Sequence, residues 1–132
     1  MARRQVSLTF QWPTERPHRA IVKRVVDGDT IVCDIDLDLR SWLVDYKVRL
    51  LGCNAAEKST EAGMAAAANL QDVLRPGTPV VLTLIKDYKY GGEFCARVWL
   101  GDRDLISELI QQAWAAAWDG TGKAPVPPWP RT

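Results

Sequence analysis

Two short strings hold the residues of this chain whose types and spacing could do chemistry. Residues 25–30 read Val-Val-Asp-Gly-Asp-Thr, and residues 49–57 read Arg-Leu-Leu-Gly-Cys-Asn-Ala-Ala-Glu. Each string places polar residues at the end of an apolar, strand-like run. Together they offer carboxylic acids from both strings, a guanidinium and an amide, which are the groups that a metal-assisted phosphodiesterase uses.

The first chemical interpretation is a cation site. A hard cation such as calcium takes carboxylate, amide and main-chain carbonyl oxygens. Asp29, the side chain of Asn54 and the carbonyl of Ala55 supply one of each, if the strand before Asn54 ends beside the turn at Asp29. Glu57 is then placed to hold a water for in-line attack on phosphorus. Arg49 suits equatorial phosphate oxygens because the guanidinium is a two-pronged donor.

Each of these residues also has an ordinary structural interpretation. Residues 27–30 form a good turn and strand start whatever they bind, because Asp-Gly turns are common. Glu57 can simply precede the helix expected from Thr60, and Arg49 can be a strand residue on the solvent-facing side. The order and spacing of the residues, rather than any single residue, favour a function.

Alternation and propensity predict the elements that position these strings. Over residues 30–39, apolar residues at every odd position alternate with the acids Asp34, Asp36 and Asp38, which is typical of a half-buried strand. Ser59 or Thr60 can cap a first helix that ends at residues 75–77, and Asp104 can cap a second. Strands are expected at residues 20–26, 30–39, 43–51, 80–86 and 94–100, and helices at residues 60–74 and 105–114.

This order of elements predicts an α+β, mainly β, chain: an OB-fold-like five-stranded barrel with two accompanying helices. The 132 residues suffice for one domain that buries its own core. The tail, residues 119–132, is rich in Pro and Gly and is expected to be irregular. Its aromatic residues Trp118 and Trp129 are expected to fold back on the body, since exposed tryptophans are uncommon.

Composition limits the class of protein. No apolar run is long enough to span a bilayer, so no membrane association is expected. The basic N-terminus is not followed by a continuous apolar stretch and makes a poor signal peptide. Cys33, Cys53 and Cys95 are scattered, which indicates reduced, buried thiols and a cytoplasmic protein.

Charge leaves two interpretations open. The net charge is only +1, so the chain lacks the basic excess typical of duplex-binding proteins. Residues 1–24 are nevertheless basic and residues 27–38 are acidic. A cation site beside a basic flank suits a phosphate-backbone substrate, and two solvated faces of opposite sign explain the distribution equally well.

In these motifs the chain resembles the staphylococcal nuclease (thermonuclease-like) family. That family carries Val-x-Asp-Gly-Asp-Thr, then Arg-Leu-x-Gly-Ile-Asp-Ala-Pro-Glu, then a Lys-Tyr-Gly-Arg string before the last barrel strand. Residues 25–30 match the first string closely, residues 49–57 match the second with changes, and residues 89–93 match the third imperfectly. The resemblance runs from about Ala20 to Trp114. The tail resembles that of short phage-borne members.

The resemblance implies a role for each matching residue and a division of the chain. Asp29 corresponds to the family's carboxylate metal ligand, Asn54 stands where the second metal-binding aspartate normally stands, and Ala55 contributes only its main-chain carbonyl. Arg49 corresponds to the phosphate-binding arginine, and Glu57 to the glutamate assigned to general-base or water-positioning duty. The divisions are an N-terminal extension (1–19), a nuclease-like OB-fold domain (20–118) and a Pro/Trp-rich tail (119–132).

The third string implies substrate contacts and one loss. Lys89 and Tyr90 correspond to residues near the nucleotide's other phosphate. The family's second catalytic arginine is expected at Gly92 or Glu93 and is absent. Arg97 offers a partial replacement because it shares the strand face of Glu93.

These departures can be weighed. Asparagine at position 54 removes a unit charge beside the metal, worth up to about 4 kcal/mol at an effective dielectric constant of about 20. Losing one donor to a developing anion costs roughly 10²–10³ in rate. The resemblance therefore implies a nuclease that cuts DNA or RNA with Ca²⁺ or another hard divalent cation, weakened at two positions. The alternative is an inactive OB-fold module that binds single-stranded nucleic acid or a protein partner.

Overall fold

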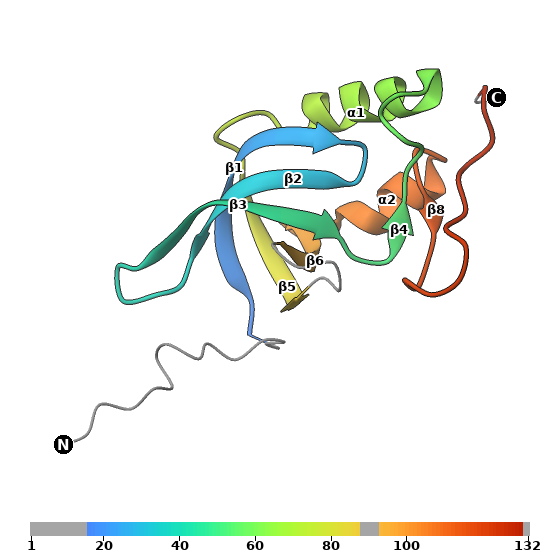
Figure 1. Ribbon diagram of the computed structural model, residues 1–132. Coiled ribbons are helices and arrows are strands. Elements are labelled where there is room, and N and C mark those ends of the chain that lie inside the picture. The colour runs from blue at the N-terminus through green and yellow to red at the C-terminus, as the bar shows by residue number, and fades with distance from the viewer. Residues whose placement is uncertain (1–15, 88–92, 131–132) are drawn as a thin grey trace.

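The computed structural model describes residues 16–87 and 93–130 (Figure 1). Strands dominate, and two helices pack against the outside of the sheet. In chain order the elements are β1 (His18–Asp27), β2 (Thr30–Asp36), β3 (Trp42–Leu50), β4 (Cys53–Asn54), α1 (Glu61–Val73), β5 (Pro79–Asp87), β6 (Phe94–Leu100), β7 (Arg103–Asp104), α2 (Leu105–Gln111) and β8 (Ala116–Ala117).

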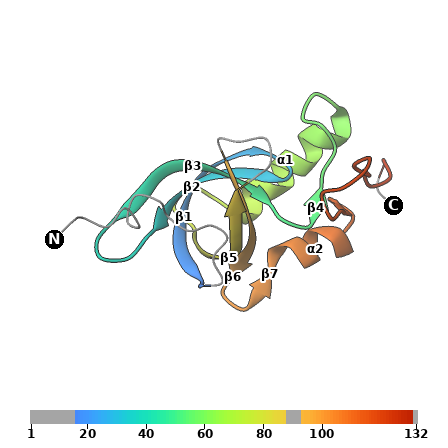
Figure 2. The same cartoon turned by 60° about the horizontal axis from the view of Figure 1, so that its bottom comes forward.

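Five strands close into a barrel. The sheet order is β3-β2-β1-β5-β6-β7, and its neighbouring strands are antiparallel. A parallel pairing between β3 and β6, with Val48 opposite Phe94 and Leu50 opposite Ala96, joins the two ends of the five-stranded sheet. The turned view in Figure 2 shows α1 and α2 outside the strands. The predicted OB-fold-like barrel with two helices is confirmed.

One predicted strand is too long. Alternation predicted a strand over residues 30–39, but β2 ends at Asp36. Asp38, Leu39 and Arg40 have positive φ angles of 73°, 53° and 66°, and the Asp36 carboxylate accepts the N–H of Asp38. The chain turns there, and Leu39 is 95% exposed. Alternation fails at this point because turn geometry overrides it.

The helices begin at the predicted caps. The Thr60 hydroxyl accepts the N–H of Gly63 at the start of α1, and the Asp104 carboxylate accepts the N–H of Ser107 at the start of α2. The helix predicted over residues 105–114 ends earlier, at Gln111. Neither helix has the length or the apolar composition that crossing a bilayer demands, and the described residues contain no other helix.

Close contacts at α1 hold the loop after β4 against the barrel. A methyl group added at Gly63 would lie 1.7 Å from the carbonyl oxygen of Glu57. One added at Gly28, in the β1–β2 turn, would lie 2.8 Å from the β-carbons of Ala55 and Ala66. Glycine at these two positions therefore lets the turn, the loop and the helix approach one another.

We expect Gly63→Ala to lower the free energy of unfolding by about 3 kcal/mol, since either the loop or the helix must move. Denaturant unfolding measures the loss. Ala65→Gly, on the same helix, is the control and is expected to cost about 1 kcal/mol through helix propensity alone. A Gly63→Ala protein that loses no more stability than this control would contradict the packing described for Glu57.

The three cysteines are free and buried, as predicted. Burial raises the pKa of Cys33 and of Cys53 to about 12, with smaller contributions from the charges of Asp34 and Asp29, respectively. We therefore expect these two thiols to react with Ellman's reagent at pH 8 about a thousandfold more slowly than in the unfolded chain, because the thiolate is the reactive form. Labelling of Cys33 and Cys53 at the rate of the unfolded chain would contradict the burial of these two thiols.

The end of the described chain folds back on the barrel. β8 pairs with β4, and residues 118–130 contain neither helix nor strand (Figure 1). The Trp118 ring is half-buried, and its Nε1 donates to the carbonyl of Thr121 at 2.8 Å. Trp129 Nε1 donates to Glu61 Oε1 at 3.1 Å. The predicted irregular tail is confirmed over the described residues; Trp118 is half-buried, whereas Trp129 contacts α1 but remains 40% exposed.

Candidate functional site

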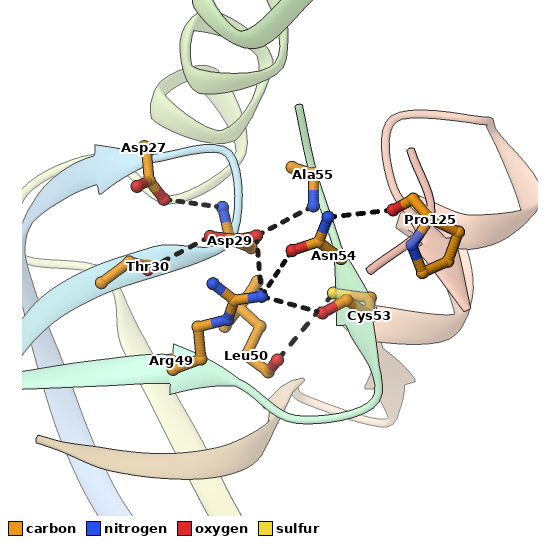
Figure 3. Close-up of polar contacts among 9 residues, drawn as sticks. All are labelled: Asp27, Asp29, Thr30, Arg49, Leu50, Cys53, Asn54, Ala55 and Pro125. Atoms are coloured by element: carbon orange, nitrogen blue, oxygen red, sulfur yellow. Dashed lines mark hydrogen bonds and ion pairs between the residues drawn. The ribbon is translucent and has the colours of Figure 1, made fainter. Parts of the chain in front are cut away.

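Polar groups from three segments meet at one end of the barrel (Figure 3). Asp29 lies in the β1–β2 turn, Arg49 lies near the end of β3, and Asn54 lies in β4. The register of β2 against β3 pairs Thr30 with Arg49, and the N–H of Leu50 donates to the carbonyl of Asp29 at 2.8 Å. Sheet pairing thus sets the first two side chains next to each other.

The carboxylate of Asp29 is the buried centre of the group. Its Oδ2 accepts the N–H of Ala55 at 2.8 Å and lies 3.2 Å from Arg49 Nη2. Its Oδ1 accepts the hydroxyl of Thr30 at 3.2 Å, and the side chain is only 5% exposed. Burial, followed by a hydrogen bond with Asp27, raises the pKa of Asp29 to about 7 although Arg49 and Ala55 lower it. Arg49 alone therefore compensates the buried charge incompletely.

The guanidinium of Arg49 joins the two predicted metal-ligand side chains. Its Nη2 donates to Asn54 Oδ1 at 2.8 Å while it pairs with Asp29 Oδ2. The same nitrogen lies 3.5 Å from the carbonyl of Cys53, and Cζ lies 5.9 Å from the centre of the Trp118 ring. Arg49 thus occupies the position between the two side-chain oxygens that were predicted to hold a cation.

The amide nitrogen of Asn54 faces the segment near the C-terminus. Its Nδ2 donates to the carbonyl of Pro125 at 2.9 Å (Figure 3). The Arg49 guanidinium offers only donors and a carbonyl offers only an acceptor, so both contacts are satisfied in one orientation of the amide. In that orientation Asn54 presents its oxygen to the site.

The chemistry of the donors fits a hard divalent cation. Asp29 and the amide of Asn54 offer hard oxygens of the kind such a cation prefers, whereas the atom of Ala55 that contacts Asp29 is its N–H. The charge is low, because no three His, Cys, Asp or Glu side chains in residues 16–87 and 93–130 group together as metal ligands. A site with one carboxylate is expected to bind a cation weakly. A cation between Asp29 and Asn54 must also take the place of Arg49 Nη2.

A pocket of about 220 Å³ opens beside Arg49. Arg49 and Lys86 line it as cations, Asp87 and Asp119 line it as acids, and Trp118 adds an aromatic ring. Lys86 follows a register shift in the β5–β6 pairing, between Thr83 and Lys86. Two cations beside a tryptophan can hold a phosphate and a stacked base.

Other predicted residues stand apart from this group. Glu57 is exposed, and among the described residues its carboxylate makes neither a hydrogen bond nor an ion pair. Arg97 pairs with Asp104 and donates to the carbonyl of Leu51 at 3.4 Å, and it is not among the residues that line the pocket. Lys89 and Tyr90 lie outside the described residues.

Two groups of the site were missed by sequence reasoning. Trp118 was expected to fold back, but nothing in its neighbours indicated that it lies over Arg49. Pro125 takes part through its main-chain carbonyl, which every residue has, so no sequence signal could have found it.

No model of a known protein family matches the chain, and no curated protein matches it. The resemblance described above therefore remains a prediction from the motifs.

Proposed function

We propose that this protein is a phosphodiesterase that cuts DNA or RNA strands at the Asp29–Arg49–Asn54 end of the barrel, with calcium or another hard divalent cation. One observation supports this proposal above the others. The guanidinium of Arg49 contacts both the buried Asp29 carboxylate and the Asn54 amide oxygen, and Arg49 lines a pocket together with Lys86 and Trp118.

Asp29, Asn54 and the carbonyl of Ala55 would hold the cation. When bound, such a cation supplies positive charge to a phosphoryl oxygen. With a cation beside Asp29, Arg49 would be able to donate to the equatorial oxygens of the phosphate. Lys86 binds a neighbouring phosphate, and Trp118 stacks on a base.

Glu57 accepts the proton of the attacking water. Water adds to phosphorus, one P–O ester bond breaks, and the leaving oxygen takes a proton from solvent. Among the described residues the exposed carboxylate of Glu57 makes no hydrogen bond or ion pair that would have to break, and its loop begins at Ala55, directly after β4. The three free thiols support a cytoplasmic location for this activity.

The test is cleavage of single-stranded and duplex DNA and of RNA, each across a calcium series. We expect metal-dependent cutting that falls by about 10²–10⁴-fold in Glu57→Ala, since that is the usual contribution of a general base. Asp72→Ala removes an exposed carboxylate from the far end of α1 and is the control. Equal cutting by the Glu57→Ala and Asp72→Ala proteins would exclude Glu57 as the base.

A second candidate function is binding of single-stranded nucleic acid without cleavage. The observation that favours it is the position of Arg49, whose guanidinium already serves as the cation between Asp29 and Asn54. This function predicts strand binding that does not depend on calcium and no cutting at any calcium concentration. Fluorescence anisotropy of a labelled oligonucleotide, measured beside the cleavage assay, separates the two functions.

A further inference from the structure

The C-terminal segment, here residues 116–130, lies along the strand that carries Asn54. Within it, β8 pairs antiparallel with β4, and the N–H of Trp118 donates to the carbonyl of Gly52 at 3.0 Å. Figure 1 shows this segment running past β4 and beyond the start of α1. Its first part is therefore attached to the same strand end as the candidate site.

Two further contacts hold the later part of the segment. Asn54 Nδ2 donates to the carbonyl of Pro125, 71 residues away in the chain. Trp129 Nε1 donates to Glu61 Oε1 in the first turn of α1 at 3.1 Å. The contact at Asn54 is the one that links the segment to the Asp29–Arg49 group.

That contact needs an asparagine. The amide of Asn54 accepts from Arg49 through Oδ1 and donates to Pro125 through Nδ2, and both atoms have a partner at 2.8–2.9 Å. An ionised aspartate can accept from Arg49 but has no donor for Pro125. Its second oxygen would meet the carbonyl oxygen at this distance, which is repulsive.

We propose that the hydrogen bond from Asn54 anchors the C-terminal segment beside the site. The same bond, accepted by the carbonyl of Pro125, orients the Asn54 amide with its oxygen toward Arg49. The inference rests on the proposed function only in assigning that oxygen to the cation. Asparagine at position 54 therefore stabilises the docked position of the C-terminal segment, whereas aspartate at this position destabilises it.

Trypsin cleavage after Lys123 tests whether the hydrogen bond from Asn54 holds the C-terminal segment in place. Lys123 is exposed and lies between the contacts made by Trp118 and Pro125. Under dilute trypsin the cleavage rate follows the fraction of segment that is undocked. We expect the rate to rise at least about tenfold in Asn54→Asp, and about fivefold in Asn54→Ala, which loses one hydrogen bond without adding charge.

Gln71→Glu is the matched control, since it adds the same charge at an exposed position of α1. We expect its cleavage rate to stay within about twofold of the original, as for other exposed positions. Mass spectrometry identifies the Lys123–Ala124 cut. Cleavage of both Asn54 variants at the rate of the original protein would overturn the proposal.

A separate measurement, hydrogen exchange of the Asn54 side-chain amide, tests whether the C-terminal segment positions this amide. Trp129→Ala, made without truncating the chain, removes the contact with Glu61 and loosens the segment at a distance from Asn54. We expect hydrogen exchange of the Asn54 side-chain amide, followed by ¹⁵N NMR, to speed up at least about threefold. Trp42→Ala, a tryptophan change on the exposed part of β3, is expected to leave that exchange unchanged. An unchanged rate in Trp129→Ala would overturn the positioning role.

Neither measurement uses a metal or a nucleic acid. A protein that cuts no strand would refute the proposed function, and these two experiments would still decide the role of the C-terminal segment.

Discussion

Replacing Arg49 by alanine is expected to lower the free energy of unfolding by about 3–5 kcal/mol at pH 8, because the Asp29 carboxylate is left buried without its cation. The Asp29 side chain is 5% exposed and that of Arg49 is 16% exposed, so water replaces little of the lost interaction. Denaturant unfolding of purified protein without added metal measures the change. The loss should shrink toward acid pH, since a protonated Asp29 needs no cation.

The control for this prediction is Arg19→Ala. Arg19 also pairs with a carboxylate, Asp36, but its side chain is 80% exposed and such pairs contribute little. The double variant Asp29→Asn/Arg49→Ala is expected to recover most of the stability lost in Arg49→Ala. If Arg49→Ala cost no more than Arg19→Ala, the ion pair would not be the internal compensation for Asp29.

The second large effect is expected from Asp29→Asn, which should reduce calcium-dependent cleavage by at least about a thousandfold. Removing a unit charge from contact with a cation costs about 4 kcal/mol at an effective dielectric constant near 20, which is close to three decades in affinity. The fold should survive, because an amide oxygen can still accept from Ala55 and Arg49, and the Thr30 hydroxyl can turn to accept from the new amide nitrogen.

The same variant carries a stability prediction of definite sign. Burial raises the pKa of Asp29 from 3.8 to about 7 in the folded protein. The folded state therefore holds a proton that the unfolded state releases, and stability falls as pH rises from about 4 to about 7, by at most about 1.4 kcal/mol per pH unit. Asp29→Asn should remove this fall. Retained pH dependence in the variant, or cleavage at the original rate, would contradict the assignment of Asp29.

The meeting of Asp29, Asn54 and Ala55 was predictable because each follows a strand-like run, and strand ends meet at the rim of a barrel. The end of β2 at Asp36 was not predictable from alternation, because the positive φ angles from Asp38 to Arg40 depend on the whole hairpin.

The partners of Arg49 and Asn54 were not predictable either. Arg49 was expected to point to a phosphate, but its guanidinium contacts the side-chain oxygens of Asp29 and Asn54. The partner of the Asn54 amide is a main-chain carbonyl 71 residues away, which depends on the path of an irregular segment. Contacts of this kind follow from tertiary structure and leave no local pattern.

The most direct test of the central claim is the initial rate of cleavage of a 5′-labelled single-stranded DNA, measured from zero to ~10 mM calcium, a range that covers weak protein sites. A cation site built on one carboxylate predicts cutting that is absent without calcium and saturates toward the upper end of this range. Strand binding without any cutting across the whole range would contradict it, and would mean that Arg49 is the permanent cation of the site.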